Sequence, residues 1–140
     1  MHGVNQKLEF FPVRIAVLIV SDTRTTETDT SGALLVQRIE TAGHVVAERL
    51  IVPDDVMSIR NTVSAWIADP DVDVVISSGG TGLTGRDVTP EAVTPLFEKT
   101  IDGFSVIFHQ VSFQSVGLST LQSRAVAGLA GGTFIFCLPG

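Results

Sequence analysis

Short apolar runs alternate with amphipathic segments along the chain. The apolar runs have the length of strands, and a strand that is covered on both faces has an unbroken apolar sequence. Four runs predict strands, over residues 14–20, 44–52, 73–77 and 133–138. The segments between them have apolar residues at helical spacing, which predicts helices over residues 33–42, 56–67, 90 to about 98 and 104–113.

Glycine and proline residues set the expected ends of these elements. Gly43 suits the position after a helix C-terminus, and the residue before Pro70 is disfavoured in a helix. Pro95 is expected to kink or end the helix that begins at Pro90. The polar segment 23–31 is expected to be a loop. Strands separated by helices favour an α/β domain with a mostly parallel sheet and helices on both faces.

A glycine-rich loop joins the third strand to the next helix. The sequence at 74–92 is VVISSGGTGLTGRDVTPEA, with four glycines in seven residues. Because glycine has no Cβ, the backbone N–H groups of such a loop can come close to an anion. Ligands of open α/β proteins bind at the carboxyl ends of the strands, where this loop is expected to lie. We therefore expect the loop to be the centre of a site for an anionic ligand.

Two nucleotide-binding motifs match this loop only in part. Residues 80–85 fit G-x-G-x-x-G, but three residues separate the motif from the predicted helix, and no strand ending in an acidic residue follows at the required distance. The Walker pattern has Arg86 and Asp87 at its lysine and its serine or threonine positions, which disfavours a standard NTPase. A generic dinucleotide or flavin domain is the weakest of the alternatives.

Three aspartates are expected at one edge of the sheet. Asp22 follows the first strand, Asp54 the second and Asp87 the third. Carboxylates there suit Mg²⁺ and a reaction of phosphates. Two of them also have a structural alternative, because Asp54 or Asp55 caps the next helix and Asp87 braces its own loop. From the residue type alone, contact with a ligand and bracing of the loop are about equally expected for Asp87.

Composition excludes several classes of protein. The 140 residues are 44% apolar, enough for one folded domain, yet no apolar run is long enough to span a membrane. The net charge of −6 and the scattered basic residues argue against a nucleic-acid binder. The single cysteine, Cys137, cannot form an intrachain disulfide, fits a reducing cytoplasm and is expected to be buried. The three histidines lack metal-ligand spacing.

The two ends of the chain carry expectations of their own. Residues 1–12 are interpreted as an arm, whose Phe10 and Phe11 are expected to be buried against the domain or against a neighbouring subunit. The domain itself is expected over residues 13–140. Because the sequence stops directly after a predicted strand, we expect that a C-terminal helical part is missing from it.

Four motifs resemble the MoaB/Mog molybdopterin-binding family. They are SGGTG at 78–82, GRDVTPEA at 85–92, VSDT at 20–23 and LPG at 138–140, in the family's order and spacing. The resemblance implies a three-layer α/β/α domain that assembles as a homotrimer or homohexamer in the cytoplasm. It also implies adenylylation of molybdopterin, the substrate, with Mg²⁺ as cofactor and ATP as co-substrate.

The resemblance also assigns roles to residues. Asp54 is implied as a catalytic residue and Mg²⁺ ligand, and Asp87 as a catalytic residue that binds molybdopterin. The other implied contacts to molybdopterin or phosphate are Ser21, Asp22, Thr23, Ser78, Gly79, Gly80, Thr81, Gly82 and Ser112. His109 occupies a position where many relatives have arginine, so one permanent cation near Ser112 is lost.

The resemblance leaves two functions open. The protein is either a molybdopterin adenylyltransferase or a non-catalytic carrier that binds molybdopterin or a nucleotide, GTP included. Retention of Asp54 and Asp87 favours the enzyme, whereas the missing C-terminal part favours the carrier. The early segment resembles the B-type branch, some members of which bind the pterin without adenylylating it.

Overall fold

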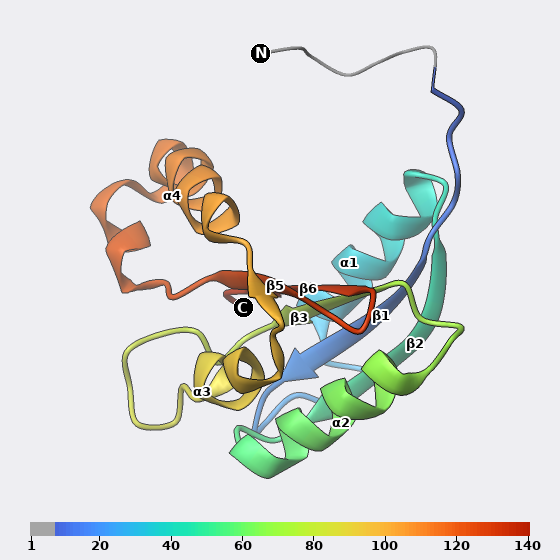
Figure 1. Ribbon diagram of the computed structural model, residues 1–140. Helices are drawn as coiled ribbons and strands as arrows, with labels where there is room; N and C mark the ends of the chain where they lie inside the picture. Colours follow the sequence, from blue (N-terminus) through green and yellow to red (C-terminus); the bar gives the residue numbers. More distant parts are fainter. Residues whose placement is uncertain (1–7) are drawn as a thin grey trace.

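A six-stranded sheet forms the centre of the protein, in the order β2-β1-β3-β6-β5-β4 (Figure 1). The computed structural model describes residues 8–140. Its strands are β1 (Arg14–Val20), β2 (Val45–Val52), β3 (Val74–Ser78), β4 (Lys99–Thr100), β5 (Val126–Ala130) and β6 (Thr133–Leu138). Strands β1, β2, β3 and β6 are parallel, whereas β5 is antiparallel to both of its neighbours. The prediction of a mostly parallel sheet is confirmed.

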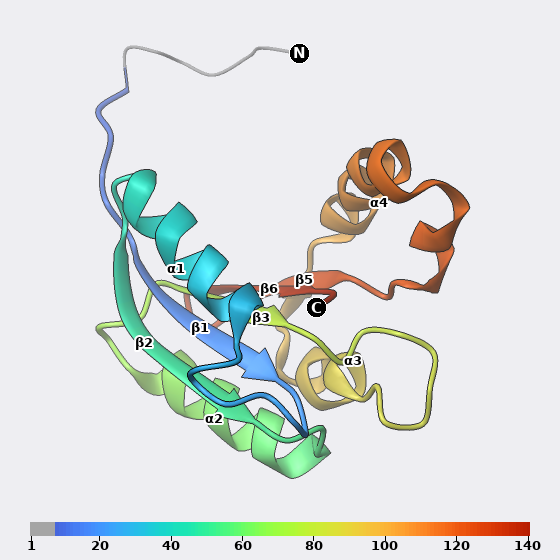
Figure 2. The same cartoon turned by 180° about the vertical axis from the view of Figure 1, so that it is seen from behind.

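Helices cover both faces of the sheet (Figures 1 and 2). The α-helices are α1 (Thr30–Thr41), α2 (Val56–Ala68), α3 (Thr89–Val93) and α4 (Asp102–Val116). Helices α2 and α3 pack on one face, and α1 packs on the other. Helix α4 lies on the α1 face, where the ring of Phe104 contacts that of Phe136 at a centroid distance of 5.3 Å. The result is the three-layer α/β/α arrangement.

Side chains of β1 alternate between two cores, as the period of a strand requires. Ile15, Val17 and Ile19 pack in one core with Ile39 of α1. Ala16, Leu18 and Val20 pack in the larger core with Ile59 and Val63 of α2. All six of these β1 side chains are buried, which explains why the sequence of this strand is continuously apolar.

The predicted elements are present, with shifted ends. The predicted strands correspond to β1, β2, β3 and β6. The helix at Pro90 ends at Val93, and the 3₁₀ helix η1 (Thr94–Leu96) contains Pro95, so the expected early end is confirmed. Helix α1 begins at Thr30 because Asp29 caps it, so the interpretation of 23–31 as loop is wrong for its last two residues.

Two strands and a 3₁₀ helix were not predicted: β4, β5 and η2 (Gly117–Gln122). Strand β5 has the sequence VAGLA, which lacks both alternation and large side chains. A Cβ on Gly128 would lie 2.3 Å from the ring of Phe97. The glycine that weakens the strand pattern is therefore the residue that gives Phe97 room to pack.

Asp29 connects three parts of the α1 side of the molecule. Its carboxylate accepts a hydrogen bond of 2.8 Å from the backbone N–H of Gly32 and so caps α1. The same carboxylate accepts a 2.8 Å hydrogen bond from Nη2 of Arg49 on β2. The Asp29 side chain is only 1% exposed, so these hydrogen bonds replace the water that would otherwise solvate its carboxylate.

We expect Asp29→Ala to lower the free energy of unfolding by about 2 kcal/mol, because it removes the cap and leaves Arg49 without its carboxylate. Urea denaturation followed by circular dichroism measures the loss. The control is Asp71→Ala, since the Asp71 side chain is 82% exposed and pairs with Arg14 at the surface. That change is expected to cost less than about 0.5 kcal/mol. Equal losses in the two variants would contradict the role of Asp29.

Two expectations about apolar residues have different outcomes. Cys137 is fully buried, as expected, and burial raises the pKa of its thiol to about 11. Phe10 is 59% and Phe11 71% exposed in the single chain, so they are not buried against the domain, and burial against a neighbouring subunit stays a prediction. The ring of Phe10 packs beside that of His44, with a centroid distance of 5.2 Å. Residues 1–7 of the predicted arm lie outside the described part of the chain.

Membrane-spanning helices are absent from residues 8–140, because none of the helices there combines the necessary length with the necessary hydropathy.

Candidate functional site

The glycine-rich loop, residues 79–88, lies at the carboxyl edge of the sheet between β3 and α3. The N–H of Gly79 donates to the carbonyl of Leu138 at the end of β6, at 3.0 Å. The end of the loop is tied back to its start, because Thr89 donates through its N–H to the carbonyl of Gly80 and through its hydroxyl to that of Gly79. The loop is thus a closed turn beside the end of β6.

Glycine is required at the first two positions of this loop. Gly79 has φ of 105° and Gly80 has φ of 72°, in the region that other residues rarely adopt. A Cβ on Gly79 would lie 2.3 Å from the carbonyl oxygen of Val20, and one on Gly80 would lie 2.2 Å from Oγ1 of Thr89. The backbone of the loop therefore packs directly on β1 and on the start of α3.

A hollow of about 250 Å³ opens on one side of the loop. Its walls come from three segments of the chain: Gly80, Thr81, Gly82 and Asp87 from the loop, Ser119, Gln122 and Ser123 from η2 and its end, and Pro139 with Gly140. Oγ1 of Thr81 and Oγ of Ser123 are buried and have no hydrogen-bond partner among residues 8–140. Unpartnered buried hydroxyls are costly, and both of these residues belong to the wall of the hollow.

A second hollow, of about 150 Å³, adjoins the first, since Gly140 lines both. Its other polar walls are Ser21, Arg24, Asp29, Ser31 and Ser78, together with the backbone of Gly79. Ser21 shapes this side by accepting hydrogen bonds from the N–H groups of Thr23, at 3.2 Å, and Arg24, at 3.1 Å. The glycine loop is therefore shared by two neighbouring polar hollows.

The three aspartates expected at this edge do come near one another. Oδ1 of Asp22 accepts a 2.9 Å hydrogen bond from the N–H of Asp54, and its Oδ2 pairs with Arg86, whose Nε lies 3.0 Å away. Partial burial raises the pKa of Asp54, and the charges of Asp22 and Asp87 raise it further. Negative charge is thus concentrated here, and Arg86 offsets only part of it.

Asp55, rather than Asp54, caps α2. The Asp55 carboxylate accepts 2.8 Å and 2.9 Å hydrogen bonds from the N–H and the hydroxyl of Ser58. Those bonds lower the pKa of Asp55. Asp54 is consequently not needed as a cap, and its carboxylate belongs to the acidic edge.

Asp87 braces its own loop, and contact with a ligand, the other role that the sequence left open, stays a prediction. Its Oδ2 accepts hydrogen bonds from the N–H of Thr84, at 3.0 Å, and from the Thr84 hydroxyl, at 2.8 Å. The hydroxyl of Thr84 is the main reason why the pKa of Asp87 is lowered. The residue thus braces the loop, and it also lines the 250 Å³ hollow.

The fit of Mg²⁺ can be judged from these carboxylates. Within residues 8–140, no three side chains of His, Cys, Asp or Glu stand close enough together to hold a metal ion by themselves. Mg²⁺ at a nucleotide site is commonly held by one or two carboxylates, substrate phosphates and water, which does not require such a group. Burial and the charges of Asp22 and Asp87 disfavour the ionised form of Asp54, and a bound cation would offset this. Asp54 therefore fits that kind of site.

The contact implied for Ser112 stays a prediction, and several residues that line the hollow were not predicted. Ser112 lies on α4 and lines neither hollow. The residues that follow α4 and line the 250 Å³ hollow are Ser119, Gln122 and Ser123. Their only signal in the sequence is Ser123 with Arg124 in a stretch of small apolar residues. His109 is a packed residue, with Nε2 3.0 Å from the carbonyl oxygen of Ser123.

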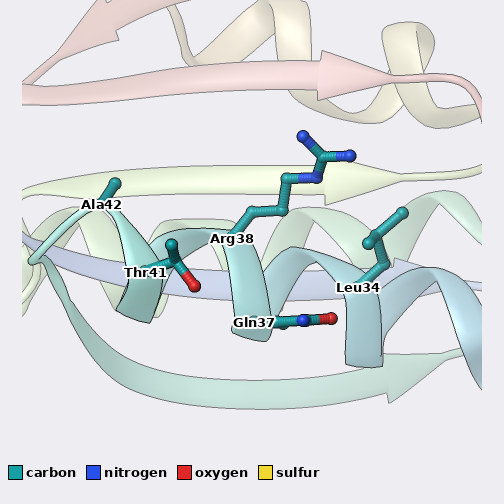
Figure 3. A pocket seen from close by; sticks show the side chains of 5 residues that line it. All are labelled: Leu34, Gln37, Arg38, Thr41 and Ala42. Atoms are coloured by element: carbon teal, nitrogen blue, oxygen red, sulfur yellow. The ribbon is translucent and has the colours of Figure 1, made fainter.

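A larger hollow, of about 490 Å³, lies away from the glycine loop (Figure 3). It is lined by Leu34, Gln37, Arg38 and Thr41 of helix α1 and by Ala42, which caps the C-terminus of that helix. Binding sites bring polar groups together from several elements, and this open helix surface does not. We assign the candidate site to the glycine loop.

The chain is similar to proteins of known name. Residues 16–140 match the family described as "Probable molybdopterin binding domain". Molybdenum cofactor biosynthesis protein B of Escherichia coli K12 is 52% identical over 132 residues, covering 94% of this chain and 78% of the relative. The protein of that name from Bacillus subtilis is 45% identical over 129 residues, covering 91% and 76%.

Solved structures agree with these relatives. The crystal structure of a molybdenum cofactor biosynthesis protein B matches with a TM-score of 0.90 at 46% identity, covering 93% of this chain and 81% of that one. The tungsten cofactor synthesizing protein MoaB of Pyrococcus furiosus matches with a TM-score of 0.82 at 33% identity, covering 92% and 82%. The chain therefore belongs to the MoaB/Mog molybdopterin-binding family of molybdenum cofactor biosynthesis.

Proposed function

We propose that this protein binds molybdopterin and Mg-ATP at the carboxyl edge of the sheet and adenylylates the terminal phosphate of molybdopterin. The observation that carries the proposal is the glycine loop, which is shared by two adjacent polar hollows and flanked by an acidic edge. A reaction between two phosphate-bearing substrates needs two neighbouring sites of this kind. Anions bind well to backbone N–H groups of glycine loops.

The proposed reaction needs no covalent intermediate on the protein. An oxygen of the molybdopterin phosphate forms a bond to the α-phosphorus of ATP, the bond to the β-phosphate oxygen breaks, and pyrophosphate leaves. When bound, Mg²⁺ supplies positive charge that offsets the triphosphate and the charge developing on the α-phosphate. The chain itself binds and orients the two phosphates so that they meet, which is a large part of catalysis in phosphate transfer.

We assign separate tasks to the two sides of the loop. Asp87, Thr81 and Ser123 would hold molybdopterin in the 250 Å³ hollow through their carboxylate and hydroxyl groups. Asp54 would hold the cation of the nucleotide from the acidic edge. Ser21, Asp22, Thr23 and the backbone of 78–82 would line the path between the two ligands. This assignment extends the implied roles of these residues, and a contact between Ser112 and molybdopterin stays a prediction.

A non-catalytic carrier of molybdopterin or of a nucleotide, GTP included, is the second candidate. It is favoured by the hydrogen bonds that already occupy two of the three carboxylates, since Asp22 pairs with Arg86 and Asp87 with Thr84. The dinucleotide alternative gains no support, because Arg86–Val88 lie between the glycine motif and the start of α3 at Thr89. We retain only the carrier as a rival.

A cytoplasmic homotrimer or homohexamer is part of the proposal. Its support is the apolar surface on and beside α4, where Val106, Ile107, Val111, Phe113, Val116, Leu118 and Leu121 are all more than half exposed. Exposed apolar surface of this extent is typical of a contact between subunits. Sedimentation velocity on the purified protein measures the assembly.

A turnover assay with molybdopterin and Mg-ATP tests the function. The protein should release pyrophosphate and form adenylyl-molybdopterin, and Asp54→Asn should form both products about 10²–10⁴-fold more slowly. Tight binding of molybdopterin without either product would replace the enzyme by the carrier. Absence of both molybdopterin binding and product would exclude the enzyme and the molybdopterin carrier, and a titration with ATP and GTP would then test the nucleotide carrier.

A further inference from the structure

Arg124 binds the glycine loop at several points although it is distant in sequence. Its backbone N–H donates to the carbonyl of Thr81 at 2.8 Å, and its Nε donates to the carbonyl of Gly82 at 2.8 Å. Its Nη2 donates to the carbonyl of Asp87 at 2.8 Å. The side chain thus links both arms of the loop, which are separated by Leu83–Arg86.

A carboxylate on α3 holds this guanidinium in place. Nη1 and Nη2 of Arg124 lie 2.5 Å and 3.1 Å from the two carboxylate oxygens of Glu91. Two parallel bonds of this kind fix the plane of a guanidinium as well as its position. Arg124 is the only cation that the structure shows bonded to the carbonyl groups of residues 79–88 within the described part of the chain.

These bonds set the direction of the loop amides. In a trans peptide the C=O and the following N–H point in opposite directions. Because the carbonyls of Thr81 and Gly82 face Arg124, the N–H groups of Gly82 and Leu83 face away from it. Gly82 lies close to the Asp87 carboxylate, which lines the ligand hollow, since a Cβ on Gly82 would be 2.7 Å from Oδ2 of Asp87.

We propose that Arg124 is a positioning residue, which fixes the glycine loop so that its amides and Asp87 face the ligand hollow. The identity of the ligand, molybdopterin, rests on the proposed function. The predicted effect of Arg124 on the loop does not depend on it. A lysine cannot replace this residue, because one ammonium group cannot reach both carbonyls and the Glu91 carboxylate in the same geometry.

The chain offers a matched control in Arg60. Its Nε donates to the carbonyl of Ala92 at 2.9 Å, and its Nη2 donates to that of Glu91 at 3.1 Å. Arg60 therefore ties α2 to α3 with bonds of the same kind but does not contact the glycine loop. A purely structural role for Arg124 would make Arg124→Lys and Arg60→Lys equivalent.

Hydrogen exchange and ligand affinity of the two variants, in the full chain, test the proposal. In Arg124→Lys, amides of residues 82–88 should exchange about tenfold or more faster, with no comparable change in Arg60→Lys. Affinity for molybdopterin should fall about tenfold or more in Arg124→Lys only, since small displacements of binding groups are costly. Equal changes of loop exchange in the two variants would overturn the proposal.

The test remains decisive if Arg124→Lys does not fold or if the wild-type protein does not bind molybdopterin. If Arg124→Lys does not fold, Glu91→Gln takes its place, because it frees the guanidinium while every loop residue is kept. Faster exchange at 82–88 supports positioning, and unchanged exchange overturns it. If the wild-type protein binds no molybdopterin, the proposed function fails, and the exchange measurement still decides the role of Arg124.

Discussion

Gly79→Ala is expected to lower the free energy of unfolding by about 3 kcal/mol and to abolish binding of molybdopterin. Gly79 has φ of 105°, which costs a residue with a Cβ about 1–3 kcal/mol. The new methyl group would also lie 2.3 Å from the backbone oxygen of Val20. The contact joins a Cβ atom to a backbone carbonyl oxygen, so no side-chain rotation relieves it. The loop or the end of β1 has to move.

Gly85→Ala is the matched control for that prediction. No atom lies within 4 Å of a Cβ at Gly85, and its backbone is not in the positive-φ region. Loss of a flexible glycine at such a position is neutral or stabilises by about 0.4–1 kcal/mol. Urea denaturation and a molybdopterin-binding titration measure both variants. A Gly79→Ala protein with normal affinity would show that the loop backbone is not part of the site.

The buried parallel strands could be predicted because their local sequence determines them. β1 is covered on both faces, so its apolar run follows directly from its position in the sheet. The carboxyl-edge location of the glycine loop then follows from the parallel order of β1 and β3. These two facts were enough to place Asp22, Asp54 and Asp87 near one another.

The remaining elements depend on contacts that are distant in sequence. Strand β5 is held by β6 and by Phe97, whose ring occupies the space above Gly128, and none of this is visible in VAGLA alone. The same reason explains the site residues that sequence reasoning missed. Ser119, Gln122 and Ser123 reach the glycine loop only because the chain returns from α4 to β5 past it. Arg124 becomes informative once its partners Gly82 and Glu91 are known.

Asp54→Asn is expected to lower the rate of adenylyl transfer by about 10²–10⁴-fold, the range for removal of a group that acts in the transition state. The substitution keeps the size of the side chain and removes the charge proposed to hold Mg²⁺. Pyrophosphate release at saturating substrates measures the rate. Asp55→Asn is the control, because Asp55 caps α2 and asparagine caps a helix about as well as aspartate, so both stability and rate are expected to be kept.

Stability should respond to Asp54→Asn in the opposite direction to activity. The pKa of Asp54 is raised by burial and by the neighbouring charges of Asp22 and Asp87, so the folded protein disfavours its ionised form. At low pH, where Asp54 is neutral in both states, the variant and the wild type should unfold with similar free energies. As pH rises through the raised pKa, the wild type loses stability that the neutral asparagine keeps. A variant that is less stable than the wild type at pH 7 would mean that Asp54 has a structural role, and any loss of turnover could then be a loss of fold. A variant that is at least as stable but inactive would assign the carboxylate to the reaction itself, because the charge would then be kept at a cost to the fold.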